Sequence, residues 1–318
     1  MTKTKIIIIA IFLLFCSLNV ISVFHAYHMS YFVTDGTRTK NPEQLAFFEK
    51  LSILLTGVKI PKPVNKRYPS NFGLNFTNHR IQTNSGIFLD SWLIEGKDKE
   101  NLIILFHGYA ASMESNLERS FLLNEHGFST LLIDFRGSGN SSENYTTMGF
   151  YEADDIHSVL EFVNAKFKYK NIIFFGRSMG AAAIFTYLAK YGYQPKAVIV
   201  ESLFDNLLNT TSNRFYLMNL PAFPFAHLLI FWGSLIHGYN GFNFNPADYA
   251  LKIKSNTLLL YGKHDGRITL DETNEIYKNL AGKKKLHVFQ KAGHNINLSK
   301  NKIEWQNEVI GFINHELQ

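Results

Sequence analysis

Residues 171 to 185 read NIIFFGRSMGAAAIF, and this stretch decides the fold. The apolar run before Gly176 shows no polar alternation, which is typical of a buried parallel strand, and the alanine-rich run after Gly180 favours a helix. Between them lies G-x-S-x-G, in which a serine on a tight strand-to-helix turn exposes its hydroxyl above the sheet. Ser178 is therefore a candidate nucleophile. The alternative is a serine that only begins a helix after a glycine turn.

Strands and helices alternate along the rest of the chain, which indicates an α/β protein with a mostly parallel central sheet flanked by helices. The first two strands are expected to form a hairpin around Asn84-Ser85-Gly86. The expected strands are 79–83, 87–94, 102–106, 129–133, 171–175, 197–200, 257–261 and 286–289. The expected helices are 113–125, 151–162, the one after Ser178, 271–280 and 302–314. In such a sheet the ligand site lies at the carboxyl ends of the strands.

Two further residues with suitable chemistry follow expected strands. Asp265 comes after the strand 257–261, and His294 comes after the strand 286–289. A serine hydroxyl needs an adjacent base to become a nucleophile, and the base needs a carboxylate to orient it. Because the chain order is Ser, Asp, His and all three leave the same sheet edge, we expect Ser178, Asp265 and His294 to form a catalytic triad.

A tetrahedral intermediate also requires hydrogen-bond donors for its oxyanion. The backbone N–H of Met179 and that of Tyr109, in the loop after the strand 102–106, are the expected donors. Gly108 allows the sharp turn of that loop. The ring of His107 precedes the turn and is expected to brace the loop rather than act as a base.

Over residues 75 to 318 the chain resembles serine hydrolases of the α/β-hydrolase superfamily. Within it, the membrane-anchored Bem46-like hydrolases and the monoacylglycerol-lipase-like and S33-peptidase-like enzymes are the most similar groups. The matching segments are 105–108, 134–141, the turn at Ser178, 261–265 and 293–294.

The resemblance carries the triad to Ser178, Asp265 and His294 and the oxyanion donors to Tyr109 and Met179. It implies a structural role for Asp134 and Arg136. Relatives often have a proline near the acid, where this chain reads Gly266-Arg267-Ile268. Some relatives place the acid after an earlier strand, which would here be Glu201 or Asp205; we rank Asp265 ahead of both.

The N-terminus resembles a membrane segment. Lys3 and Lys5 precede the apolar run from Ile6 to Phe24, which as a helix would span about 28 Å. A retained signal anchor is favoured over a cleaved signal peptide because no clear small-residue cleavage site follows. Either reading exports the rest of the chain, since the lysines stay cytoplasmic.

We therefore predict three parts: a signal anchor or signal peptide (1–30), an amphipathic connector with a helical stripe over 42–56 (31–74), and a catalytic α/β-hydrolase domain (75–318) with a lid at about 204–250. The segment 204–250 is rich in aromatic side chains. An apolar lid favours acyl or aryl groups, because buried apolar area supplies binding energy. The alternative is that these aromatic residues form the core of the lid or meet the membrane.

Composition limits the remaining possibilities. The net charge of +6 is scattered and no basic stripe with stacking aromatic residues occurs, so nucleic acid is not an expected partner. Cys16 is the single cysteine, which excludes an internal disulfide and a thiolate metal site. No metal or organic cofactor is implied, and the sequence does not indicate an oligomeric state.

The sequence thus predicts a serine hydrolase of lipid-like or medium-chain carboxylic esters. An S33-type serine peptidase would use the same triad and would need an acidic group for the substrate amine, for which Glu201 or Asp205 is available. A thioesterase is a third possibility. A binding module without activity is disfavoured because no triad member is missing.

Overall fold

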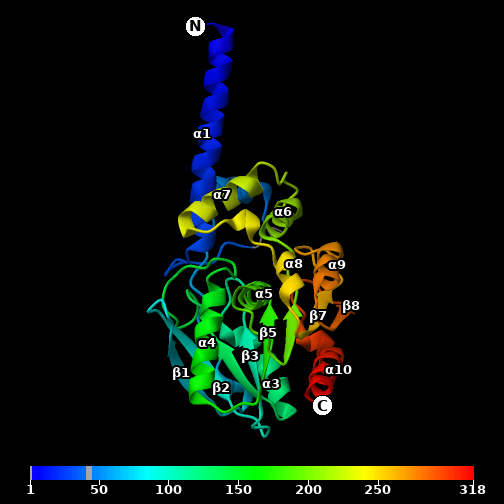
Figure 1. The fold of residues 1–318 in the computed structure, drawn as a ribbon. Coiled ribbons are helices and arrows are strands. Elements are labelled where there is room, and N and C mark those ends of the chain that lie inside the picture. The colour runs from blue at the N-terminus through cyan, green and yellow to red at the C-terminus, as the bar shows by residue number, and fades with distance from the viewer. Residues whose placement is uncertain (1, 41–44) are drawn as a thin grey trace. The chain divides into compact units, whose positions relative to one another are not determined.

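The computed structural model describes residues 2 to 40 and 45 to 318, apart from the side chains of residues 54 and 56. Contacts within the chain divide it into two units (Figure 1). The first unit consists of Met1–Pro61 and Leu207–Phe244, and the second of Lys62–Asn206 and Asn245–Gln318. The insertion between two strands of the second unit therefore belongs with the N-terminal helices.

The second unit is built on one 8-stranded sheet with the order β1-β2-β4-β3-β5-β6-β7-β8. Antiparallel pairing joins β1 to β2 and β2 to β4, and all other neighbours are parallel. The strands are β1 (Thr77–Gln82), β2 (Phe88–Ile94), β3 (Asn101–Phe106), β4 (Ser129–Ile133), β5 (Asn171–Arg177), β6 (Ala197–Glu201), β7 (Asn256–Gly262) and β8 (Lys284–Phe289).

Helices cover both faces of this sheet. On one face α3 contacts α10, and on the other α4, α5, α8 and α9 contact one another in sequence. Successive residues of β5 show the two faces, since Phe174 packs against Tyr187 of α5 while Phe175 packs against Trp305 of α10. The helices are α3 (Leu117–Glu125), α4 (Glu152–Lys166), α5 (Met179–Tyr191), α8 (Pro246–Tyr249), α9 (Leu270–Asn279) and α10 (Leu298–Leu317).

The α/β class, the mostly parallel sheet and the N-terminal hairpin are confirmed. The expected helix 113–125 divides into a 3-10 turn at Met113–Asn116 and α3. The last helix begins earlier than expected, at Leu298, and is interrupted at Asn301, whose φ of −126° is not helical. Local side-chain bonds explain the early start, because Asn297 Oδ1 accepts the N–H of Ser299 and caps the first turn.

The first unit contains α1 (Lys3–Ser30), α2 (Phe47–Thr56), α6 (Leu207–Leu217), α7 (Phe225–His237) and a 3-10 turn at Gly241–Asn243. By length and composition α1 can cross a membrane, and its most apolar 18-residue window has a mean hydropathy of 2.9. The amphipathic helix predicted over 42–56 begins later, at Phe47, as α2; residues 42 to 44 lie outside the described part of the chain. Within this unit α7 contacts both α1 and α6.

Candidate active site

Ser178 lies on the tight turn between β5 and α5. Its backbone has φ 49° and ψ −112°, a conformation that a non-glycine residue rarely adopts. The flanking glycines are required by space. A Cβ on Gly176 would lie 2.6 Å from Ile184 Cδ1, and a Cβ on Gly180 would lie 2.6 Å from the carbonyl oxygen of Phe106. The turn thus has the strained geometry that the G-x-S-x-G pattern predicts.

The side chains of Ser178, His294 and Asp265 form one hydrogen-bonded chain. His294 Nδ1 lies 2.8 Å from Asp265 Oδ2, and His294 Nε2 lies 3.2 Å from Ser178 Oγ. Because a carboxylate only accepts hydrogen bonds, Nδ1 carries the proton and Nε2 is left to accept from the serine hydroxyl. The structure therefore brings together the three residues that the sequence selected, in the orientation that a general base requires.

The carboxylate of Asp265 is held from both sides. Its side chain is fully buried, and Oδ1 accepts the backbone N–H groups of Arg267 and Ile268 at 2.8 and 3.1 Å. A proline at 267 or 268 would lack the N–H that is used here. The departure at Gly266-Arg267-Ile268 is therefore compatible with a fixed acid, because the loop supplies its own donors.

The loops that carry Asp265 and His294 interlock. The N–H of His264 donates to the carbonyl of Ala292 at 2.9 Å, and Ser202 Oγ donates to the carbonyl of His294 at 2.8 Å. A Cβ on Gly262 would lie 2.2 Å from the carbonyl oxygen of Gly293, so the two loops touch backbone to backbone. This close approach fixes the distance between the acid and the imidazole.

The loop after β3 passes directly beside Ser178. A Cβ on Gly108 would lie 3.3 Å from the carbonyl oxygen of Arg177 and 3.6 Å from Ser178 Cβ. Tyr109 is the next residue of this loop, and Met179 is the first residue of α5, where backbone N–H groups have no partner within the helix. These are the positions at which the sequence predicts the oxyanion donors; that role stays a prediction.

The ring of His107 connects two loops. It is fully buried, its Nε2 accepts the N–H of Phe135 at 3.1 Å, and its Nδ1 lies 2.8 Å from the carbonyl of Gly108. Burial lowers the pKa of His107 to about 4, so the ring is neutral at neutral pH. Through these contacts the ring connects the loop after β3 with the residues that follow β4.

Glu201 and Asp205, the alternative acids, have other partners. The Glu201 carboxylate is buried and accepts from Arg119 Nε at 2.9 Å and from Trp305 Nε1 at 2.8 Å, while Arg177 Nε lies 3.3 Å away. Asp205 accepts from the backbone N–H of Asn206 at 2.6 Å. Asp265 is the carboxylate that contacts the imidazole.

Two arginines that no sequence motif marked as functional, Arg119 and Arg177, surround the Glu201 carboxylate. Arg177 Nη2 donates to Asn295 Oδ1 at 3.2 Å, and Arg119 Nη2 donates to the carbonyl of Ile296 at 3.0 Å, so both reach the loop that follows His294. Burial lowers the pKa of Arg177 to about 10. Arg177 was visible as the second residue of G-x-S-x-G, but nothing in the pattern around Arg119 signals its contact.

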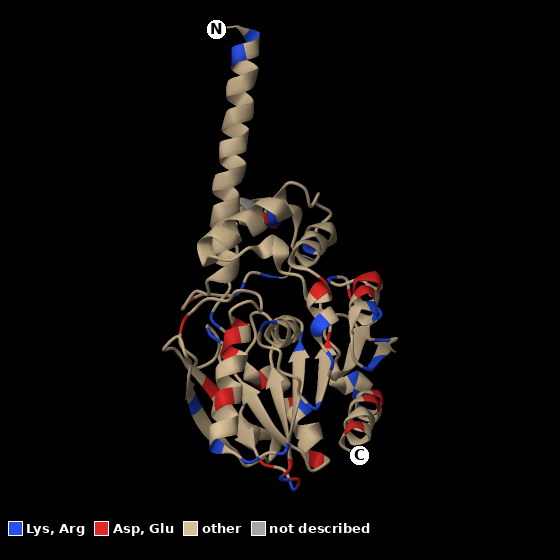
Figure 2. Ribbon diagram, viewed as in Figure 1, with Lys and Arg blue, Asp and Glu red and all other residues tan. Residues whose placement is uncertain are grey.

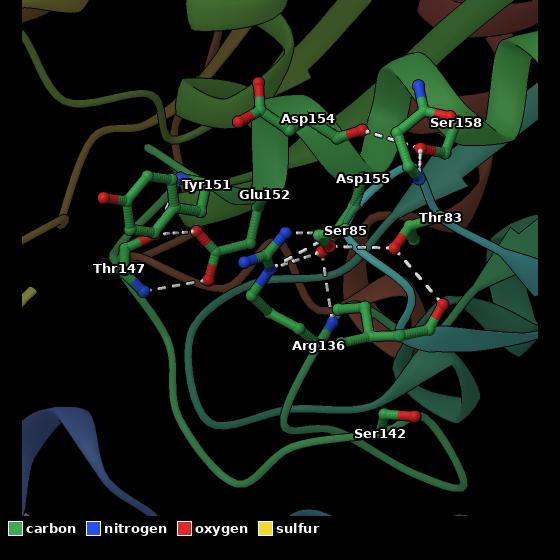
Figure 3. A network of polar contacts seen from close by, with 12 residues as sticks. Thr83, Ser85, Arg136, Ser142, Thr147, Tyr151, Glu152, Asp154, Asp155 and Ser158 are labelled. Carbon is green, nitrogen blue, oxygen red and sulfur yellow. Dashed lines mark hydrogen bonds and ion pairs between the residues drawn. The ribbon is translucent and has the colours of Figure 1, made fainter.

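Arg136 lies in a separate polar network with Thr147, Glu152 and Asp155 (Figure 3). Arg136 binds Asp155 through Nε and Nη2, the latter at 2.6 Å. Glu152, from the same turn of α4 as Asp155, accepts from the backbone N–H groups of Thr147 and Gly149 at 3.0 and 2.9 Å. These bonds hold the loop before α4 against α5, since a Cβ on Gly149 would lie 3.0 Å from the N of Ala183 in α5.

Comparison with known proteins agrees with this architecture. The model of the family described as serine aminopeptidase, S33 matches residues 97–204. The uncharacterized protein YqkD of Bacillus subtilis is 25% identical over 235 residues, which covers 72% of this chain and 76% of that protein. Protein bem46 of Schizosaccharomyces pombe is 24% identical over 238 residues, covering 71% and 73% of the two chains.

Among solved structures, an esterase of Pyrococcus furiosus superposes with a TM-score of 0.69 at 24% identity, covering 80% of this chain and 96% of that one. Sheet order and structural similarity show that the chain has the α/β-hydrolase fold, and the family match together with the similarity to bem46 supports an α/β-hydrolase superfamily member.

Proposed function

We propose that this protein is a serine hydrolase that cleaves carboxylic esters through an acyl-enzyme intermediate. The observation that carries the proposal is the hydrogen-bonded chain from Ser178 Oγ through the His294 ring to Asp265. Ser178 Oγ lies 3.2 Å from His294 Nε2, the ring nitrogen that would accept its proton, and this distance is within the reach of a general base.

In the proposed reaction Ser178 Oγ bonds to the ester carbonyl carbon while its proton moves to His294 Nε2. The backbone N–H groups of Tyr109 and Met179 stabilise the oxyanion, and Asp265 stabilises the imidazolium. The ester C–O bond then breaks, and the alcohol leaves with the proton from His294. A water molecule attacks the acyl-serine in the same way and releases the carboxylic acid.

The similarity to an esterase structure and the aromatic insertion 207–244, in which Arg214 is the one residue among Asp, Glu, Lys and Arg, favour esters with an apolar acyl chain. The S33 match over 97–204 supports an aminopeptidase as a second candidate. That reaction needs a carboxylate to bind the substrate amine. Glu201 already forms ion pairs with Arg119 and Arg177, so its charge is compensated within the protein. An ester substrate is therefore the better proposal.

A fluorophosphonate probe tests the nucleophile. We expect stoichiometric adduct formation on the intact protein, read by mass, and none in Ser178→Ala. Folded protein without an adduct would overturn the proposal. The wild type is then assayed on p-nitrophenyl esters from acetyl to dodecanoyl, on acyl thioesters and on aminoacyl-arylamides. We expect the highest kcat/KM for medium-chain oxygen esters; a preference for arylamides would favour the peptidase, and a preference for thioesters the thioesterase.

A further inference from the structure

The first unit joins two parts of the chain that are far apart in the sequence. Trp232 Nε1 of α7 donates to Asn19 Oδ1 of α1 at 3.1 Å. The ring of Tyr31, directly after α1, stacks on His237 at the end of α7, with centroids 5.3 Å apart and an interplanar angle of 17°. The second half of α1 therefore has a folded partner within this unit (Figure 1).

Small residues on α1 lie between those two contacts. Ser22 and Ala26 are 3% and 7% exposed, although nearly all of the preceding half of the helix is exposed. Small side chains allow two helices to approach closely, also within a membrane. A signal peptide that is removed has no need of such a packing surface, so this contact favours retention of α1.

The position of Asn19 indicates the depth of α7. The apolar run from Ile6 to Phe24 spans about 28 Å, close to the hydrocarbon thickness of about 30 Å. Asn19 lies within this run, about 7.5 Å before its end at 1.5 Å per residue. The indole of Trp232, which bonds to Asn19, must then reach the boundary of the hydrocarbon region, where tryptophan is enriched.

Two polar side chains of the run, Ser17 and Asn19, have hydrogen-bond partners within the protein. Asn19 Nδ2 donates to the carbonyl of Phe15 at 2.9 Å, and its Oδ1 accepts from Trp232. Ser17 Oγ donates to the carbonyl of Leu13 at 2.8 Å. These hydrogen bonds lower the cost of transferring Ser17 and Asn19 into lipid.

The chain around α7 carries no charge. No Asp, Glu, Lys or Arg occurs between Arg214 and Asp248, in a protein that is 18% charged overall. In Figure 2 the ribbons of α7 and of α1 beyond its first turn are tan, the colour of residues other than Lys, Arg, Asp and Glu. Phe223, Phe231 and Leu235 are nevertheless 73%, 46% and 59% exposed. An exposed apolar surface of this kind is typical of a binding face, and continuity with α1 identifies lipid as what covers it.

We propose that α1 is retained in the mature protein and that α7 docks on the bilayer that α1 crosses, on the side away from Lys3 and Lys5. The exposed side chains of Phe223, Phe231 and Leu235 enter the lipid interface, and the contact between Trp232 and Asn19 sets the depth of α7. The insertion between β6 and β7 is thereby kept at the membrane surface. This inference does not depend on the chemistry at Ser178.

The protein carries its own probe for this arrangement. It has three tryptophans, and Trp92 and Trp305 are 1% and 0% exposed in the core of the second unit. The full chain is reconstituted in phosphatidylcholine vesicles with and without brominated acyl chains, which quench nearby indoles. We expect brominated lipid to quench part of the tryptophan emission of the wild type. This quenching should be absent in Trp232→Phe. Equal emission in both vesicles, or quenching that survives the substitution, would overturn the proposal.

A matched pair of charge substitutions tests the docking face. Leu235 in α7 and Leu251 in the second unit are both 59% exposed. Leu235→Asp should reduce the quenching at least twofold, because a carboxylate is expelled from the interface, and Leu251→Asp should leave it unchanged. Equal effects of the two variants would contradict the docking face.

The intact mass of protein recovered from the membranes of expressing cells must include α1; a chain that begins after Phe24 would contradict retention.

Discussion

The backbone N–H of Ser178 donates a 2.8 Å hydrogen bond to the carbonyl oxygen of Glu201. This bond ties the turn between β5 and α5 to the end of β6. The carboxylate of the same glutamate accepts from Arg119 at 2.9 and 2.7 Å, and Arg119 also donates to the carbonyl of Ile296 at 3.0 Å. One buried residue therefore connects the turn that carries Ser178 with the loop that follows His294.

The hydrogen bonds described for Arg119 go to the Glu201 carboxylate and to the carbonyl of Ile296. Glu201→Gln therefore removes the negative charge that these bonds contact. Because a buried cation is then left without its counterion, we expect the free energy of unfolding to fall by about 3–5 kcal/mol. Urea denaturation measures this change. Glu118→Gln is the control, since that carboxylate lies 3.6 Å from Arg67 and is half exposed, and a change below about 0.5 kcal/mol is expected. Similar small losses in both variants would show that the network contributes little.

Asp265→Asn replaces the acceptor of the His294 Nδ1 proton by an amide. An amide nitrogen facing Nδ1 stabilises the other imidazole tautomer, which cannot accept the serine proton. We expect kcat/KM for a p-nitrophenyl ester to fall by about 10³–10⁴-fold, with the circular dichroism spectrum unchanged. Asp271→Asn, at an exposed position of α9, should leave kcat/KM unchanged. Activity above a tenth of the wild-type value in Asp265→Asn would exclude an orienting role for this carboxylate.

Gly180→Ala and Gly311→Ala should change stability in opposite directions, although both glycines lie in helices. A Cβ at 180 would lie 2.6 Å from the carbonyl oxygen of Phe106, so the start of α5 must move. We expect a loss of about 1–3 kcal/mol and slower fluorophosphonate labelling. A Cβ at 311 meets no atom within 4 Å, and alanine there should add about 0.5–1 kcal/mol. Thermal unfolding measures both; a stable, fully reactive Gly180→Ala would contradict the close packing at the turn.

His107 and Asp134 should give opposite contributions to the pH dependence of stability. Burial lowers the pKa of His107 from 6.5 to about 4, so its contribution is complete above pH 6.5 and is lost as the pH falls towards 4. Burial raises the pKa of Asp134 from 3.8 to about 7, so the folded state keeps a proton that the unfolded state releases. Stability from this group is lost as the pH rises from about 4 to 7.

Removing either group should reveal the contribution of the other to the pH dependence of stability. Relative to the wild type, His107→Gln should lose stability as the pH rises from 4.5 to 6.5, by up to about 1.4 kcal/mol per pH unit. Asp134→Asn should gain stability over the same range. Urea midpoints at pH 4.5, 5.5 and 6.5 measure the slopes. Variants with the slope of the wild type would show that neither group changes its pKa on folding.

Much of the second unit could be predicted because its signals are local. Buried parallel strands read as short apolar runs, and the turn at Ser178 needs glycines at 176 and 180 that are visible in five letters. Parallel strands end at one sheet edge, so residues that follow β5, β7 and β8 had to lie near one another. The order of strands in the sequence therefore predicts that Ser178, Asp265 and His294 lie at the same edge of the sheet.

The contacts that depend on how helices pack could not be predicted. Arg119 lies in a short helix and reaches Glu201 across 82 positions of sequence, and no periodic pattern marks such a pair. The interruption of α10 at Asn301 likewise has no signal as strong as a proline or glycine. Propensity and periodicity describe neighbours in the chain, whereas these features depend on side chains that meet only after the layers are assembled.

By itself, the sequence determined the α/β class, the strand-to-helix turn at Ser178 and the chain order of Ser178, Asp265 and His294. The class follows from the alternation of strand and helix patterns, and the turn follows from five adjacent residues. The tertiary structure decided which carboxylate contacts the imidazole, since Glu201 is drawn to two arginines while Asp265 meets His294 at 2.8 Å. It also decided that the insertion belongs with α1, through the bond between Trp232 and Asn19. Both outcomes depend on long-range packing, in which charge and shape are matched between segments that the sequence keeps far apart.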